Sequence, residues 1–220
     1  MKKVLFTIAI FVMAAVAANA QSIQWHQSYD GNQKFVADFF KSDSNFNVYS
    51  YNEFTVTNYQ AVGYGIIYGE YRIAGSHFLG HLETRFRTSD FPFDKTPTAM
   101  YLPYDHNMIN AGFAYELLLG NFCFNITPMY RYDFGSDHKH NWQFSINSSA
   151  DFEKFYYEGY LDIWGPNKFN LCTEQKVYYK ITPMVHVGVN LMLFNFNGNE
   201  IIIGDGSWNF QPWLVARLAF

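Results

Sequence analysis

The sequence has few cysteines, few prolines and no long uninterrupted apolar run after its first 20 residues. Its two cysteines, Cys123 and Cys172, are too few for a disulfide framework in a chain of 220 residues, so we expect free thiols. The most apolar later stretch, Met184 to Phe194, is interrupted by His186 and Asn190 and is shorter than the roughly 20 residues that a membrane helix needs. If the chain meets a membrane, it must do so with strands.

The first 20 residues have the pattern of a secretory signal peptide. The opening residues, MKK, precede a largely apolar run up to Ala17 and the small-residue cleavage sequence Ala18-Asn19-Ala20. We therefore expect residues 1–20 to be removed and residues 21–220 to form one exported domain.

The exported part lacks clusters of positive charge. Without the two lysines of the signal peptide, the 15 basic residues become 13, which against 19 acidic residues gives a net charge of −6. No basic block is present that could follow a phosphate backbone, which argues against nucleic acid as a partner. Aromatic residues, by contrast, make up 20% of the chain, and they favour strands and membrane interfaces.

Apolar and polar residues alternate with a period of two along most of the chain. The clearest case is the stretch from Phe78 to Arg87, in which a mainly apolar set alternates with a mainly charged one. The first set is Phe78, Gly80, Leu82, Thr84 and Phe86, and the second is Leu79, His81, Glu83, Arg85 and Arg87. A strand places such sets on opposite faces. The same test predicts twelve strands, at residues 23–30, 34–42, 46–57, 64–73, 78–88, 108–119, 122–134, 142–147, 155–163, 169–181, 185–193 and 208–220.

Strand length and connection length favour a membrane barrel. Most of the predicted strands have 8 to 13 residues, which is enough to cross a bilayer at a tilt. The expected fold is an all-β, closed antiparallel transmembrane β-barrel of about 12 strands, with both termini on the periplasmic side. Connections on that side are short (74–77, 120–121, 153–154, 182–183), and those on the other side are mostly longer (89–107, 135–140, 195–206), as in outer-membrane barrels.

The last strand indicates which face is outside, a question that period two alone leaves open. Phe210, Leu214, Ala216, Leu218 and Phe220 alternate with Asn209, Gln211, Trp213 and Arg217. An amphipathic strand that ends on Phe is similar to the signal recognised by the outer-membrane assembly machinery. We therefore expect the apolar face outward, Phe220 as an assembly signal, and a place in the outer membrane of a Gram-negative cell. Outer-membrane lipids and the barrel-assembly machinery would be its partners.

Aromatic residues also gather near predicted strand ends, as interfacial girdles would. They are Trp25, Tyr29, Tyr64, Tyr130, Tyr132, Trp142, Phe155, Tyr157 and Trp208.

If the apolar face of each strand is outside, a set of mostly polar side chains points into the lumen. The candidates for a solute path are Tyr49, Tyr51, Glu53, Glu70, Arg72, His81, Glu83, Arg85, Arg87, Glu116, Arg131, Asp133, Glu158, Tyr160, Trp213 and Arg217, joined by Asp162, Lys176, Tyr178 and Lys180. One interpretation is that these charges pair across strands and fill a narrow barrel, because an unpaired buried charge is costly. The other is a selective channel in which rings stack on a flat base or sugar. Its stacking candidates are Tyr49, Tyr51, Tyr156, Tyr160, Trp164 and Trp213.

Several short segments carry a family resemblance. They are VADFFKSD at Val36 to Asp43, FNVYSYNEF at Phe46 to Phe54, YGEYRI at Tyr68 to Ile73 and HLETRF at His81 to Phe86. The chain resembles the nucleoside-specific, channel-forming Tsx family of outer-membrane proteins. That resemblance implies a monomeric twelve-stranded barrel with a narrow lumen that passes nucleosides, a small-molecule solute.

Two other functions compete with a channel for small polar solutes. A lipid-hydrolysing barrel enzyme would need Ser, His and a carboxylate, but no nucleophile motif stands out and no Ser is obviously placed beside His81 and Glu83. We therefore predict no catalytic residue and no enzyme activity. A structural or adhesive barrel would instead use the long connection 89–107. The sequence Asp137-His138-Lys139-His140 is polar enough for a solvated loop, so we predict no metal ligand and no cofactor.

Overall fold

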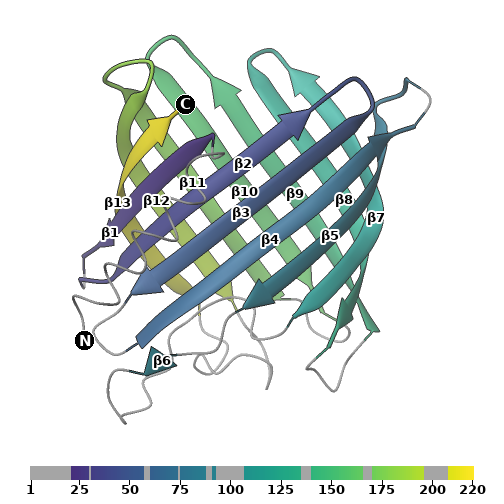
Figure 1. Cartoon of the computed structure of the whole chain (residues 1–220), viewed down its shortest axis with the longest axis horizontal. Coiled ribbons are helices and arrows are strands. Elements are labelled where there is room, and N and C mark those ends of the chain that lie inside the picture. Colours follow the sequence, from purple (N-terminus) through teal and green to yellow (C-terminus); the bar gives the residue numbers. More distant parts are fainter. Residues whose placement is uncertain are drawn as a thin grey trace.

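Antiparallel strands follow one another around a ring in the computed structural model of the chain (Figure 1). The structure describes residues 21–29, 31–56, 60–73, 75–87, 91–92, 107–134, 140–165, 170–195 and 208–220. The strands are β1 (Ser22–Ser28), β2 (Gln33–Ser42), β3 (Phe46–Val56), β4 (Gln60–Arg72), β5 (Phe78–Arg87), β6 (Phe91–Pro92), β7 (Met108–Leu119), β8 (Phe122–Asp133), β9 (His140–Asp151), β10 (Phe155–Trp164), β11 (Asn170–Lys180), β12 (Val185–Asn195) and β13 (Asn209–Ala219).

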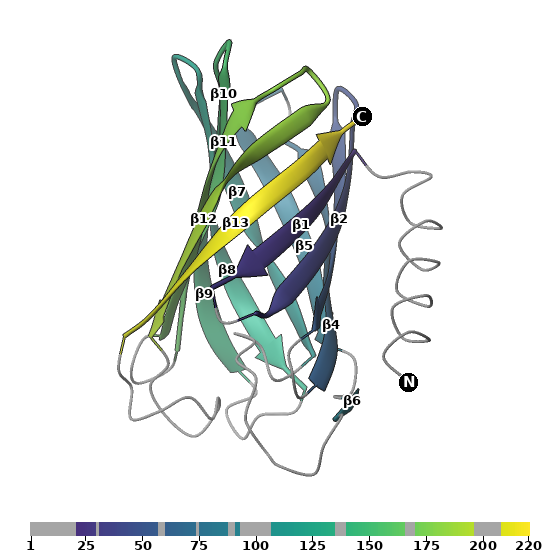
Figure 2. The same cartoon turned by 90° about the vertical axis from the view of Figure 1, so that its left-hand side faces the viewer.

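The ring is closed by the last strand. β13 pairs with β12 on one side and with β1 on the other, where Ala219 lies opposite Ser22 (Figure 2). The two-residue β6 pairs with the start of β4 and stands outside this ring of twelve. Closure lets the strands satisfy one another's backbone groups, which is the condition for spanning lipid with strands. The predicted closed, twelve-stranded antiparallel barrel is confirmed.

No helix within the described segments has the length and hydropathy needed to cross a membrane.

The two ends of the barrel differ in their connections (Figure 1). At one end, which we call the short-turn end, lie the start of β1, the end of β13 and the connections 43–45, 120–121, 152–154 and 181–184. In the turn after β2, the backbone N–H groups of Asn45 and Phe46 donate to Asp43 Oδ1 at 2.8 Å and hold the pKa of Asp43 below its usual value. The longer connections belong to the opposite, long-connection end and fall mostly outside the described residues.

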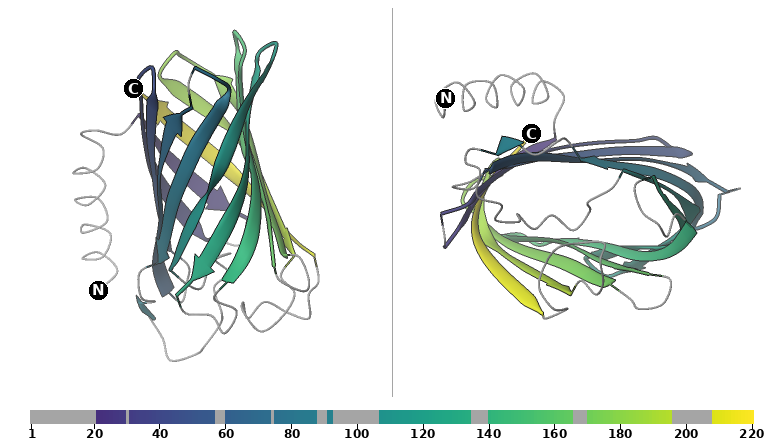
Figure 3. Two further views of the ribbon diagram at one scale, coloured as in Figure 1. Left: turned by 90° about the vertical axis from the view of Figure 1, so that its right-hand side faces the viewer. Right: turned by 90° about the horizontal axis from the view of Figure 1, so that it is seen from below.

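Polar and apolar residues are reversed relative to a water-soluble barrel. On the outer face Leu82 is 60% exposed, Phe113 61% and Leu214 65%, whereas the inward-facing Arg85 of β5 is only 4% exposed. Seen along the barrel, the strands form an oval ring around this polar interior (Figure 3, right). An apolar exterior around a polar lumen is stable in lipid rather than in water. The apolar face of the strands is therefore outside, as the alternation in the last strand predicted.

Some details differ from the sequence-based expectation. β9 extends from His140 to Asp151 rather than covering only 142–147, because Ser148 interrupts the alternation of residue types without interrupting the backbone pairing. The placement of Tyr64 in an outer girdle is wrong: its side chain lies inside, and the residue is 8% exposed. Tyr64 lies on the same inner face of β4 as Glu70. Its position near the predicted end of the strand had suggested a girdle instead.

Three predicted features fall outside the described residues. They are the signal peptide, most of the connection 89–107, and Asp137, His138 and Lys139. The side chain of Arg87 is likewise outside the description. His140, by contrast, is the first residue of β9, and its Nδ1 is hydrogen-bonded to Tyr130. Cys123 and Cys172 are free thiols, as predicted.

A glycine allows a close approach between β7 and β8. Pro128 has no N–H to donate, and the cross-strand register is interrupted between the pairs Gly112–Met129 and Tyr115–Ile126. A Cβ on Gly112 would lie 2.1 Å from the carbonyl oxygen of Pro128, which is backbone and cannot swing aside.

We therefore expect Gly112→Ala to lower the free energy of unfolding by about 1–3 kcal/mol, the usual cost of overpacking. Urea unfolding in detergent micelles, followed by tryptophan fluorescence, measures it. Gly80→Ala on the adjacent β5 is the control, because its added Cβ meets nothing closer than 3.9 Å. An equal loss in both variants would mean that the close approach at Pro128 is not the cause.

Candidate solute path through the barrel

The lumen contains a cavity of about 800 Å³. Its lining reaches from Gln21 beside the short-turn end to Asn32 and Gln211, which adjoin the long-connection end. The cavity therefore extends along most of the barrel's length.

Most of the predicted path residues line this cavity. They are Tyr49, Tyr51, Glu53, Glu70, Glu83, Arg85, Glu116, Glu158, Tyr160, Trp213 and Arg217. Others are inside the barrel but bound to a neighbour: Arg72 pairs with Glu116, His81 with Glu70, and Arg131 with Asp133. These side chains face the lumen, as the alternation with a period of two predicted. Their use as a solute path remains a prediction.

Arg85 links two walls of the lumen that are not adjacent in the sheet. On β5, its Nε donates to Glu83 at 2.6 Å, and its Nη1 donates to Asp162 on β10, also at 2.6 Å. Three strands, β7, β8 and β9, separate β5 from β10 around the ring, so this ion pair crosses the lumen. Asn110 also donates to Glu83 at 2.6 Å. The hydroxyl of Ser145 donates to Asp162 at 2.5 Å. Each carboxylate is thus held by more than one donor.

A second bridge joins β2 to β11. Lys34 Nζ lies 2.6 Å from Glu174 and 3.5 Å from Glu53, while Lys176 lies 3.1 Å from Glu158 and 3.6 Å from Glu174. The strands β1, β13 and β12 separate Lys34 from Glu174 around the ring, so this pair also spans the lumen. The bridges narrow the space between facing walls and keep each buried ammonium next to two carboxylates.

A third bridge is formed by an amide. Gln24 on β1 donates from Nε2 to Glu158 on β10 at 3.0 Å and to Asp38 on β2 at 3.3 Å. The hydroxyl of Tyr178 donates to the Oε1 atoms of Gln24 and Glu158, at 3.0 and 3.1 Å. A carboxamide that both donates and accepts can join these groups without adding charge.

Sequence reasoning missed four of the bridging residues: Gln24, Lys34, Asp38 and Glu174. Glu174 shares the phase of Lys176 and Tyr178 on the same strand, so the period-two test could have found it. Lys34 and Asp38 likewise share a face of β2, but Val36 and Phe40 lie on that face too, so residue type does not show which face is inward.

Tyrosines are grouped on the inner faces of β3 and β4. The rings of Tyr49 and Tyr68 stack with centroids 4.9 Å apart, and Tyr51 meets Tyr64 edge-on at 6.5 Å. All four line the cavity. Their faces and hydroxyls form a wall that can stack on a flat solute and hydrogen-bond its edge.

A second aromatic wall lies on β10 and β11, across the lumen from the first. It includes Tyr156 and Tyr160, which line the cavity, and Tyr178. The Lys176 ammonium, on this second wall, lies 5.9 Å from the ring centroid of Tyr51 on the first, so the two walls approach each other there. Near the short-turn end, the Arg217 guanidinium lies 4.3 Å from the ring centroid of Tyr156.

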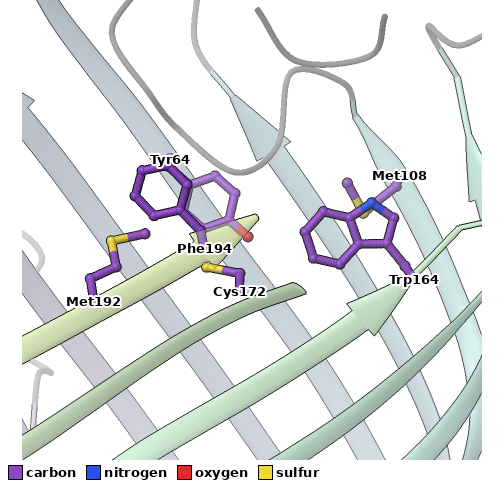
Figure 4. Packing of buried hydrophobic residues seen from close by; sticks show 6 residues of the cluster. All are labelled: Tyr64, Met108, Trp164, Cys172, Met192 and Phe194. Carbon is purple, nitrogen blue, oxygen red and sulfur yellow. The ribbon is translucent and has the colours of Figure 1, made fainter. Parts of the chain in front are cut away.

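An apolar cluster occupies the lumen toward the long-connection end (Figure 4). Its members come from five strands and are Tyr64, Met108, Trp164, Cys172, Met192 and Phe194. Trp164 ends β10 and Met108 begins β7, while Phe194 is the last residue but one of β12. Since these positions adjoin the long connections, the apolar cluster lies toward that end of the lumen.

The histidine of β5 is bound to a carboxylate on the neighbouring strand. His81 Nδ1 is hydrogen-bonded to Glu70 Oε1 at 2.9 Å, and Asn47 and Asn125 donate to the same carboxylate. Glu83, which shares a strand face with His81, is bound to Arg85 and Asn110. His81 is 7% exposed and serves to hold Glu70.

Comparison with solved structures finds porins of the same architecture. The NanC porin aligns with a TM-score of 0.59 at 6% sequence identity, covering 90% of this chain and 98% of that one. The KdgM porin aligns with a TM-score of 0.55 at 9% identity, covering 90% and 99%. A structure of KdgM in complex with disordered oligogalacturonate gives a TM-score of 0.54. At these identities the likeness shows the fold.

No protein-family model matches the sequence, and no curated protein sequence does. The resemblance to the Tsx family is therefore unconfirmed. Its implication of a twelve-stranded barrel agrees with the observed fold.

Proposed function

We propose that the chain is an outer-membrane channel for small polar solutes, with nucleosides as the solute class. The observation that supports this most is the cavity of about 800 Å³ that extends along the lumen between two tyrosine-bearing walls. A cavity of this size is within the range of small-molecule sites, and its lining mixes aromatic faces with convergent hydrogen-bonding groups. The apolar exterior supports a place among outer-membrane lipids.

Nucleosides fit this lining by their shape and chemistry. A base has two flat faces that stack on tyrosine, and the ribose hydroxyls are donors and acceptors for amides and carboxylates. Tyr49 and Tyr68 offer stacked rings, and Asn47, Gln24 and Asn125 offer amides along the same cavity. The proposal makes the protein a passive, monomeric channel that is folded by the barrel-assembly machinery and needs no cofactor.

The proposal predicts that purified protein forms small channels in planar bilayers and that adenosine reduces their current. Tyr49→Leu should raise the half-blocking concentration of adenosine roughly fivefold or more, because stacking on one ring contributes about 1–3 kcal/mol. Phe113→Leu is the control, since Phe113 lies on the outer face. Absence of both conductance and liposome swelling would refute the channel. Channels that adenosine does not block would refute the solute class alone.

A further inference from the structure

The cavity wall carries more acidic than basic side chains. Eight carboxylates line it, namely Asp38, Glu53, Glu70, Glu83, Glu116, Glu158, Asp162 and Glu174, against four bases, namely Lys34, Arg85, Lys176 and Arg217. Counting Arg72 as well, because it pairs with Glu116, makes five bases. The described lining therefore has an excess of three negative charges when every group is ionised. The pairs Arg131–Asp133 and Lys180–Asp151 are balanced and do not alter this excess.

Three of the lining bases are already bound by carboxylates. Lys34, Lys176 and Arg85 each touch two of them within 3.6 Å, and their side chains are 7% exposed or less. An anion in the lumen would have to compete with these ion pairs. These three positive charges are therefore poorly placed to attract it. The fourth lining base, Arg217, stacks on the ring of Tyr156 instead.

Two of the lining carboxylates are held mainly by groups that bring no permanent positive charge. Asp38 Oδ2 accepts from the hydroxyl of Ser22 at 2.7 Å and from the amide of Gln24 at 3.3 Å. Glu70 accepts from the amides of Asn47 and Asn125, at 3.2 and 3.0 Å, and is bonded to His81. These donors hydrogen-bond the carboxylate oxygens without adding a permanent positive charge. Asp38 and Glu70 thus direct negative potential into the cavity.

We propose that this lumen excludes anions and admits neutral and cationic solutes. The inference rests on the proposed channel function and deepens it, since it concerns the charge of the solute. Carboxylates that line a narrow path with low-dielectric walls raise the local concentration of cations and repel anions more strongly than the same charges would in open water. Asp38 and Glu70 are the residues expected to determine the preference most.

The direct test is the reversal potential of single channels between unequal KCl solutions. The expected sign is that of a cation-selective channel, with K⁺ several-fold more permeant than Cl⁻. A reversal potential at zero, or of the opposite sign, would overturn the inference while leaving a channel in place. A protein that conducts no current at all would instead remove the proposed function, and the inference with it.

Charge-removing variants show whether these residues are responsible. Asp38→Asn and Glu70→Gln keep an acceptor oxygen and remove one charge each, and each should shift the reversal potential toward zero. Asp43→Asn removes the same charge from an exposed turn, where salt screens it, and should not shift the potential. If Glu70→Gln does not fold, as judged by loss of the heat-modifiable band, Asp38→Asn alone decides. Equal shifts from Asp38→Asn and Asp43→Asn would refute the assignment.

A matched pair of sugars tests the same preference with solutes instead of ions. Galactose and galacturonate are similar in size and differ by one carboxylate. Liposomes that contain the protein should swell several-fold faster in galactose than in galacturonate. Equal rates, or faster entry of galacturonate, would contradict anion exclusion.

Discussion

Replacing Arg85 by methionine is expected to lower the free energy of unfolding by about 3 kcal/mol, the lower end of the cost of breaking a buried ion pair. Arg85 is 4% exposed and holds both Glu83 and Asp162. Without it, two carboxylates would face each other's charge across the lumen. We expect a cost at the lower end of that range because the carboxylates of Glu83 and Asp162 line the cavity and keep some access to water. Urea titration of the refolded barrel measures the change.

A compensated variant separates the missing charge from the missing contacts. Arg85→Met combined with Glu83→Gln and Asp162→Asn removes all three charges together, and it should recover most of the loss, since replacing a whole buried network is often neutral. The single variant should also increase the cation preference of the channel. Leu82→Ala, on the outer face of the same strand, should leave ion selectivity unchanged. A wild-type unfolding midpoint for the single variant would contradict the assigned role of Arg85.

Leu214→Arg is expected to cost about 2–4 kcal/mol of folding free energy in a bilayer, the measured range for a cation at the midplane of a membrane barrel. Leu214 is the sixth of the 11 residues of β13 and is 65% exposed on the outer face. Its position therefore places an arginine near the middle of the hydrocarbon. Reversible urea titration in lipid vesicles measures the cost.

Gln211→Arg is the control on the same strand, because Gln211 lines the cavity and an arginine there remains in the lumen. It should cost much less than Leu214→Arg. If the two substitutions cost the same, or if Gln211→Arg costs more, the inner and outer faces of the barrel have been exchanged.

The strands could be predicted because their two faces meet different surroundings. Lipid outside and polar lumen inside impose a period of two, which survives in residues such as His81 and Leu82 even without knowledge of the partner strands. Prediction was weaker where a small polar residue stands at an apolar position, as Ser148 does in β9. Tyr64 was misplaced because an aromatic ring suits both a girdle and a lumen wall.

The contacts inside the lumen could not be predicted from local pattern. Arg85 and Asp162 are 77 residues apart in the chain, and Lys34 and Glu174 are 140 apart. Which inward-facing side chains meet across the lumen depends on the shear of the strands and on the oval shape of the ring. The residue pattern of a single strand determines neither. The pairing of His81 with Glu70 rather than Glu83 has the same origin, because Glu70 lies directly opposite it on β4.

The central claim is that solutes cross the membrane through the lumen, and a native thiol tests it most directly. Cys123 is a free, partly exposed cysteine that lines the cavity near the short-turn end, whereas Cys172 is fully buried. Adding a cationic methanethiosulfonate reagent to single wild-type channels should reduce their current in one step and should leave Cys123→Ser channels unchanged. Wild-type protein that mass spectrometry shows to be labelled at Cys123, yet that conducts an undiminished current, would contradict the claim.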